Sequence, residues 1–175
     1  EAVLRATATS PGVVAAGDSA PFSTASGWRA AGPGAVTLLD GGATGTPSFS
    51  YALTGNTGAW SLTKVATAAQ TVPLTFRWTG FHSFFHVTTG LEAFVNRGGT
   101  DVAVVTLVNE PATGEGPVVC CAFPAGGFSY TGATALAVQP GDTFGFRVTG
   151  THADVANQLN GTLSVVEGSS PYFTV

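Results

Sequence analysis

Charged side chains are scarce in this sequence. Asp, Glu, Lys and Arg make up 9% of the residues, against about 25% in an ordinary soluble domain. Lys64 is the one lysine, although lysine is a common blocker of exposed sheet edges. A surface built mainly from Thr, Ser, Gly, Asn and Gln produces little electrostatic repulsion between two copies. Such a surface suits burial in an assembly, glycan cover or a dilute extracellular setting, and the codon bias of a GC-rich genome is the alternative explanation.

Other features that the sequence lacks exclude whole classes of function. The net charge is −4, with six basic residues, which argues against a nucleic-acid groove because phosphate neutralisation supplies most of that affinity. No apolar run approaches the ~20 residues of a membrane helix. The chain begins at Glu1 and contains no methionine, so we expect a mature form whose leader has been removed.

Catalytic signatures are also missing. No G-x-S-x-G elbow and no C-x-x-C pair occurs, so we expect no enzymatic activity and no catalytic residues. The aspartates are isolated and form no D-x-D-x-D-G loop: Asp18, Asp40, Asp101, Asp142 and Asp154. Asp142 stands where an aspartate hydrogen-bonds its own turn. We expect no cofactor, and we keep calcium open because backbone carbonyls can supply most of its ligands.

The three histidines do not form a zinc-binding pattern. His82 and His86 share one face of a predicted strand but lie about 13 Å apart along it. Zinc–nitrogen bonds are only about 2.1 Å long, so the two cannot bind one ion, and His152 would have to join by folding. We therefore predict no metal site.

Strict alternation of apolar and polar residues dominates the chain. It is clearest in Val72–Gly80, Thr143–Gly150 and Leu159–Val165, and this period of two predicts strands with one buried face. Turn sequences such as Gln139-Pro140-Gly141-Asp142 separate the candidates. The remaining predicted strands are Ala2–Thr9, Ala35–Leu39, Phe49–Leu53, Trp60–Val65, Ser83–Val87, Leu91–Val95, Val102–Val108 and Ala135–Gln139.

This pattern predicts an all-β fold with essentially no helix. About 10–11 short antiparallel strands indicate a single jelly-roll-like β-sandwich spanning residues 1–175. The first ten residues are a candidate for a separable strand that either closes its own sheet or adds to a neighbouring subunit. The alternating residues of that assembly strand would be Ala2, Leu4, Ala6 and Ala8.

Cys120 and Cys121 are adjacent, which is an unusual arrangement. Neighbouring Cα atoms lie 3.8 Å apart across a trans peptide, whereas an ordinary disulfide places them about 5.5 Å apart. A disulfide between the two therefore forms a strained ring. We favour that ring, with a bond to another subunit next and buried free thiols as the third alternative.

Sugar binding by a β-sandwich requires exposed aromatic rings. Trp60 and Trp78 belong to alternating core strands, so the candidate platform residues are Trp28, Tyr51 and Tyr130. Asn160-Gly161-Thr162 is a formal glycosylation sequon, although it lies in a predicted strand.

Three motifs carry a resemblance to a known class of domain. They are Trp60-Ser61-Leu62, Phe76-Arg77-Trp78-Thr79-Gly80-Phe81-His82, and Val138-Gln139-Pro140-Gly141-Asp142-Thr143-Phe144-Gly145-Phe146. The stretch Trp60–Val166 resembles jelly-roll-type accessory domains of bacterial secreted and cell-surface multidomain proteins. The resemblance implies the sandwich fold and an extracellular compartment. Related domains often have an acidic segment where this chain has residues 80–85, so no ion-binding role is carried over.

We therefore expect a non-enzymatic, extracellular structural or adhesive subunit that self-associates through sheet edges or strand addition. Its partners would be copies of itself or other surface proteins. A monomeric carbohydrate-binding module with glycan partners is the alternative.

Overall fold

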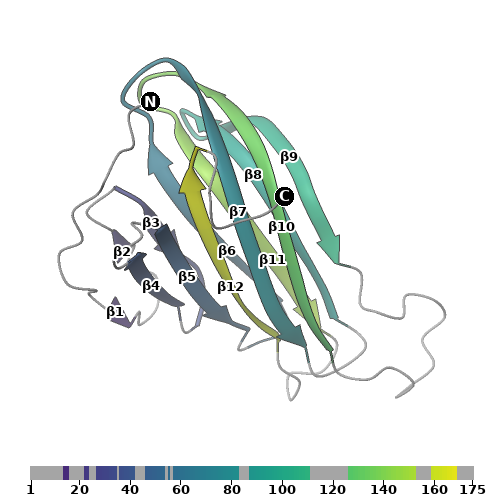
Figure 1. Cartoon of the computed structure of the whole chain (residues 1–175). Coiled ribbons are helices and arrows are strands. Elements are labelled where there is room, and N and C mark those ends of the chain that lie inside the picture. Colours follow the sequence, from purple (N-terminus) through teal and green to yellow (C-terminus); the bar gives the residue numbers. More distant parts are fainter. Residues whose placement is uncertain are drawn as a thin grey trace.

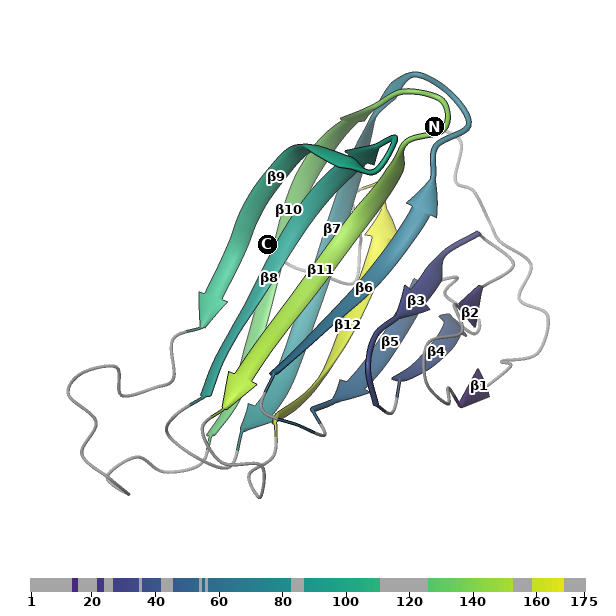
Figure 2. The ribbon, with the colours of Figure 1, turned by 180° about the vertical axis from the view of Figure 1, so that it is seen from behind.

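The computed structural model describes residues 14–15, 22–23, 27–34, 36–41, 46–53, 55, 57–82, 87–110, 126–152 and 159–168, and within these ranges it is all strand and turn. Twelve strands form two six-stranded antiparallel sheets, seen from opposite sides in Figures 1 and 2. Sheet A contains β1 (Val14–Ala15), β4 (Val36–Gly41), β5 (Thr46–Ala52), β12 (Leu159–Glu167), β7 (Gln70–His82) and β10 (Gly126–Val138), in that spatial order. Sheet B contains β2 (Phe22–Ser23), β3 (Arg29–Ala31), β6 (Thr57–Val65), β11 (Thr143–His152), β8 (Val87–Arg97) and β9 (Thr100–Glu110).

The long strands follow the jelly-roll path. From β5 to β12 the chain crosses repeatedly between the sheets, so that β5, β12, β7 and β10 are neighbours in sheet A while β6, β11, β8 and β9 are neighbours in sheet B. The predicted jelly-roll-like β-sandwich is therefore confirmed. β12, the last strand of the described chain, lies between β5 and β7 and pairs with both.

Alternation explains the core between the sheets. The inward positions of β7 and β11 are the apolar residues predicted from period two, and they are buried. Trp28, Trp60 and Trp78 are almost fully enclosed. The buried indole of Trp78 donates a hydrogen bond from Nε1 to the Tyr51 hydroxyl at 2.9 Å, which satisfies a polar group that would otherwise be costly to bury.

Gly145 allows β6 and β11 to approach closely. Its φ is +149°, and a Cβ at this position would lie 2.1 Å from the carbonyl oxygen of Leu62. No side chain fits there, so the glycine between Phe144 and Phe146 is a steric requirement of this strand pair.

The strand predictions differ from the structure in three respects. Twelve strands are described instead of about 10–11; β1, β2 and β3 were not predicted, because with two or three residues each they are too short to show alternation. The predicted strand Ala135–Gln139 covers only the end of β10, which begins at Gly126. Ala2–Thr9 and all of Ser83–Val87 except Val87 lie outside the described residues, and the single-domain boundary of 1–175 stays a prediction.

Candidate functional site

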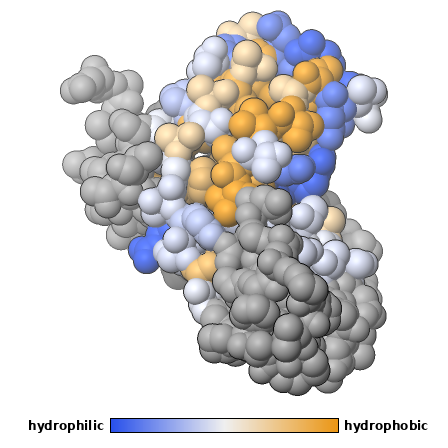
Figure 3. Space-filling model, turned by 90° about the vertical axis from the view of Figure 1, so that its right-hand side faces the viewer, coloured by the Kyte–Doolittle hydropathy of each residue, from blue (hydrophilic) through white to orange (hydrophobic). Residues whose placement is uncertain are grey.

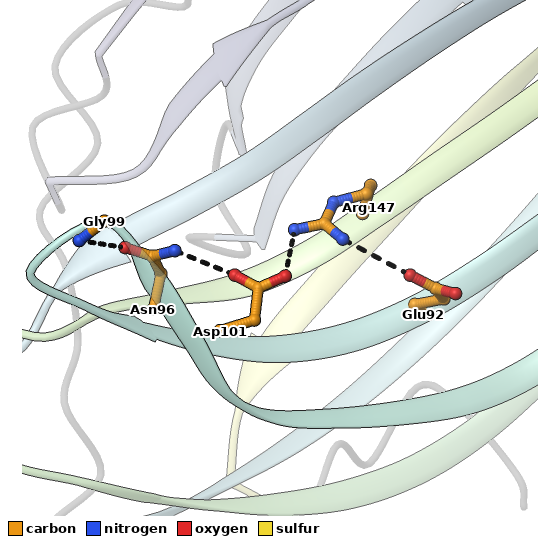
Figure 4. Close-up of polar contacts among 5 residues, drawn as sticks. All are labelled: Glu92, Asn96, Gly99, Asp101 and Arg147. Atoms are coloured by element: carbon orange, nitrogen blue, oxygen red, sulfur yellow. Dashed lines mark hydrogen bonds and ion pairs between the residues drawn. The ribbon is translucent and has the colours of Figure 1, made fainter.

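The outer surface of sheet B carries a polar cluster across three strands. Arg147 of β11 lies between Glu92 of β8 and Asp101 of β9 (Figure 4). Its Nη2 donates to Asp101 Oδ2 at 2.9 Å, and its Nη1 lies 3.5 Å from Glu92 Oε2. Asn96 extends the chain of contacts by donating to Asp101 Oδ1 at 2.8 Å and accepting the backbone N–H of Gly99 at 3.1 Å. One guanidinium therefore joins β8, β9 and β11.

An aromatic ring lies beneath this cluster. The guanidinium carbon of Arg147 is 4.3 Å from the ring centroid of Phe94, within the range of a cation–π contact. Phe94 points to the outer side of sheet B yet is 6% exposed. Arg147 therefore covers an aromatic side chain that would otherwise face solvent.

The electrostatics of the cluster favour the ionised form of Asp101. Hydrogen bonds from Asn96 and then from Arg147 lower the pKa of Asp101 below its usual value. A general acid needs the opposite, a raised pKa that keeps a proton near neutral pH. Within the described residues, no three His, Cys, Asp or Glu side chains gather as a metal site would require. The cluster is therefore suited to joining strands rather than to acid–base chemistry.

A second ion pair fixes the turn before β11. Asp142 is 1% exposed and receives two hydrogen bonds from Arg97, Nε to Oδ1 and Nη2 to Oδ2, both 2.8 Å long. Its Oδ2 also accepts the backbone N–H of Gln139 at 2.8 Å. The Arg97 hydrogen bonds, followed by that from Gln139, lower the pKa of Asp142 to about 2. The prediction that Asp142 bonds its own turn is confirmed, while Arg97 was not expected.

The predicted sugar platform is not present on the surface. Trp28 and Tyr51 are 1% and 2% exposed, so the expectation that they present ring faces to solvent is wrong. Trp28 packs edge-on against Phe144 and donates from Nε1 to Glu167. Tyr51 lies against Trp60, and burial raises the pKa of its hydroxyl. Tyr130 is half-buried, with its ring stacked 6.0 Å from that of Trp78.

Several other predicted residues can be placed only in part. Asn160 lies on β12, paired with Ala52 and Phe81, so its sequon is within a strand. Its glycosylation stays a prediction. Cys120 and Cys121, together with Ala2, Leu4, Ala6 and Ala8, lie outside the described residues.

The side of the sandwich formed by β9 and β10 exposes apolar side chains. Val102, Val104 and Val105 of β9 are 49%, 49% and 41% exposed. Figure 3 views this side and shows a hydrophobic patch bordered by hydrophilic surface. Such patches, when rimmed by polar residues, mark interaction sites. Strand Val102–Val108 was predicted from sequence, but its exposed valines were not, because alternation identifies a strand without identifying an edge.

Fold and surface together define a jelly-roll β-sandwich whose distinctive features are this apolar side and the joined strands of sheet B. No protein-family model and no curated protein sequence matches the chain. In the described part of the chain, no helix is long and apolar enough to cross a membrane.

Solved structures with similar folds come from varied sources. An infectious bursal disease virus structure (Gx strain) has 14% identity and a TM-score of 0.44, covering 71% of this chain but 30% of the viral chain. The module TmCBM61, solved with beta-1,4-galactotriose, has 14% identity and a TM-score of 0.43, covering 81% of this chain and 88% of the module. The enzymatically active domain of bacteriophage CBA120 tailspike protein 4 has 15% identity and a TM-score of 0.35, covering 81% of this chain and 20% of that one.

Proposed function

We propose that this chain is a non-enzymatic structural or adhesive subunit of an extracellular assembly, which self-associates through sheet edges or strand addition. The observation that carries the proposal is the side formed by β9 and β10. Two long strands, β9 and β10, stand there at the ends of the described strand orders, and three valines on β9 are more than two-fifths exposed. In a monomer these apolar side chains stay in contact with water, whereas an assembly would bury them.

The distribution of charge supports this function. The strands of sheet A carry only Asp40, Arg77 and Glu167 as charged residues. Sheet A also presents hydroxyls outward, as in the Ser50–Thr162 hydrogen bond of 2.9 Å. A second copy approaching the edge of this sheet therefore meets little electrostatic repulsion.

The alternative, a monomeric carbohydrate-binding module, has less support from the described surface. Such a module requires aromatic rings that are free to stack on a sugar face. Trp28 and Tyr51 are part of the core, and Tyr130 is half-buried against it. Among the aromatic side chains that the structure describes, only Phe81 is strongly exposed, at 40%.

Sedimentation velocity over a wide concentration range tests the proposed function. We expect a concentration-dependent shift from monomer to larger species in native material, and regular fibres, sheets or rings by negative-stain electron microscopy without reductant. A sedimentation coefficient that stays at the monomer value up to millimolar protein would overturn the proposal. Deleting Glu1–Ser10 then distinguishes the two routes, because only strand addition by that segment requires it.

A further inference from the structure

The four long strands of sheet A carry very little charge on their outer side. β5 and β10 contain no Asp, Glu, Lys or Arg, β7 contains Arg77, and β12 contains Glu167. Glu167 is directed towards sheet B, because its carboxylate accepts hydrogen bonds from Trp28 and Lys64. Arg77 is exposed, and within the described residues its guanidinium has no carboxylate partner. A guanidinium on an otherwise uncharged surface attracts a carboxylate, with which it can form two parallel hydrogen bonds.

Phe81 lies on the same side of β7 as Arg77. Trp78 is buried in the core. Because side chains alternate between the two sides of a strand, Arg77, Thr79 and Phe81 point outward. Phe81 is 40% exposed, so its ring is in contact with water. Arg77 and Phe81 lie about 13 Å apart along the strand, and a ligand that contacts both must therefore be a chain of several units.

Open space adjoins Phe81 on the β10 side. Its strand neighbour there is Gly127, which is exposed. A Cβ at Gly127 would lie 3.5 Å from the backbone oxygen of Gly80 and would have no other close neighbour outside the adjoining residues. No side chain therefore covers the sheet beside Phe81 at this point, and the ring can be approached from the β10 side.

Hydrogen-bonding side chains lie on the β12 side of Phe81. Asn160 is its strand neighbour, and Thr162 is the strand neighbour of Thr79. One strand further, Ser50 of β5 shares a hydrogen bond with Thr162. Amides and hydroxyls both donate and accept hydrogen bonds, as the hydroxyls of a sugar do. β12 therefore presents a polar strip alongside the exposed aromatic ring.

We propose that the outer side of sheet A binds an acidic oligosaccharide along β7, which lies between β12 and β10 (Figure 1). One sugar ring packs on Phe81 over Gly127, its hydroxyls bond to Asn160, and the carboxylate of a sugar further along the chain pairs with Arg77. The hydroxyl and amide groups beside the ring match the many hydroxyls of a sugar better than the apolar side chains of a peptide. This site goes beyond the proposed self-association and does not depend on it.

Isothermal titration calorimetry with acidic oligosaccharides and their uncharged counterparts tests the site. The probes are trigalacturonate and sialyllactose, each compared with its carboxyl methyl ester. We expect at least one acid to bind with a dissociation constant in the millimolar range or below. Its ester should bind about tenfold more weakly, because a neutral ester loses the charge-assisted hydrogen bonds to the guanidinium.

Two substitutions separate the roles of the guanidinium and the ring. Arg77→Gln should weaken binding of the acid about tenfold and leave binding of the ester unchanged. Phe81→Ala should weaken both about tenfold, since both sugars pack on the ring. The matched controls are Arg29→Gln, at an exposed arginine of sheet B, and Val104→Ala, at an exposed apolar side chain of β9. Neither control should change the affinity.

A third substitution fills the open space without removing a binding group. Gly127→Leu adds a side chain beside Phe81, and the nearest backbone atom is at an ordinary contact distance from its Cβ. We expect this variant to keep the unfolding midpoint of the parent protein and to lose binding of both acid and ester. Undiminished binding by a folded Gly127→Leu would overturn the placement of the sugar ring.

The remaining outcomes decide separate questions. If neither acid binds at millimolar concentration, the site is wrong. If acid and ester bind equally well, or if Arg77→Gln binds the acid as well as the parent protein does, the pairing with Arg77 is wrong. If a triglutamate peptide binds as tightly as the acids, the class of ligand is wrong. Sedimentation velocity tests self-association independently, so a failure of the proposed function and a failure of this site are distinguishable.

Discussion

The two sheets of the sandwich are held in different ways. Sheet A has few charges. On its inner side Trp78 of β7 is hydrogen-bonded to Tyr51 of β5 across the intervening strand β12, and on its outer side hydroxyls bond one another, as in the Ser50–Thr162 pair. Sheet B carries its bonds on the outside, where Arg147 joins Glu92 and Asp101. Buried polar contacts are costly to leave half-made, whereas surface ion pairs contribute little. The comparison therefore predicts that substitutions on the inner side of sheet A lower the stability strongly, whereas substitutions on its outer side lower it little. The outer side is thus free of structural demands that would conflict with binding a partner.

The largest effect should come from removing the buried indole in sheet A. Trp78 is fully buried and packs against Phe128 and Tyr130. We expect Trp78→Ala to lower the free energy of unfolding by about 3–5 kcal/mol, measured by urea denaturation. Arg77→Ala, on the neighbouring exposed position, is the control and should cost far less. Equal losses would show that burial does not distinguish the two sides of β7.

A smaller but more specific loss is expected from Tyr51→Phe. The substitution keeps the ring but leaves Trp78 Nε1–H without its acceptor. We expect a loss of about 1–3 kcal/mol, the cost of an unsatisfied buried donor. A double-mutant cycle with Trp78→Phe isolates the hydrogen bond, because the second change removes the donor. Strict additivity of the two changes would contradict its role.

Acid should weaken the turn at the start of β11. The folded pKa of Asp142 is lowered to about 2, against about 3.9 in an unfolded chain. A lowered pKa means that the stabilisation is fully present above about pH 4 and is lost as the pH falls towards 2. Thermal unfolding between pH 2 and pH 7 should therefore show a fall of several degrees in the midpoint at the acidic end. In Asp142→Asn that fall should be reduced, and the midpoint at pH 7 should be lower.

The smallest effect should come from the ion pairs on sheet B. Arg147 is about one-third exposed, so Arg147→Met, which keeps an apolar stem over Phe94, should lower the unfolding midpoint by no more than about 4 °C. Differential scanning calorimetry at low and high salt provides the measurement. A fall in the unfolding midpoint larger than that caused by Tyr51→Phe would contradict the expected difference between the two sheets.

The sequence predicted the fold better than it predicted the surface. Alternation identified β7, β11 and β12 because each has one buried side. The same alternation placed Tyr51 in phase with Phe49 and Leu53, a signal that pointed to the core. Trp28 had no such signal, since it is buried by Phe144 and bonded to Glu167, 139 positions away.

The contacts of the polar cluster could not be predicted, because they depend on register. Glu92, Asp101 and Arg147 become neighbours only once β8 lies between β9 and β11. The place of β10 at the end of the described strand order of sheet A depends on the same information. Local patterns show which residues face inward, and only the strand order shows which strands have no neighbour.

The position of β12 has a consequence for synthesis on the ribosome. Sheet A cannot be assembled in the order in which its strands emerge, because β5 and β7 are joined only when β12 is inserted between them. Until residues 159–167 have left the exit tunnel, both strands present unpaired backbone along one side. A nascent chain of this topology therefore carries two strands with an unpaired side from the emergence of β7 until that of β12, and a stall in this interval would prolong their exposure to aggregation.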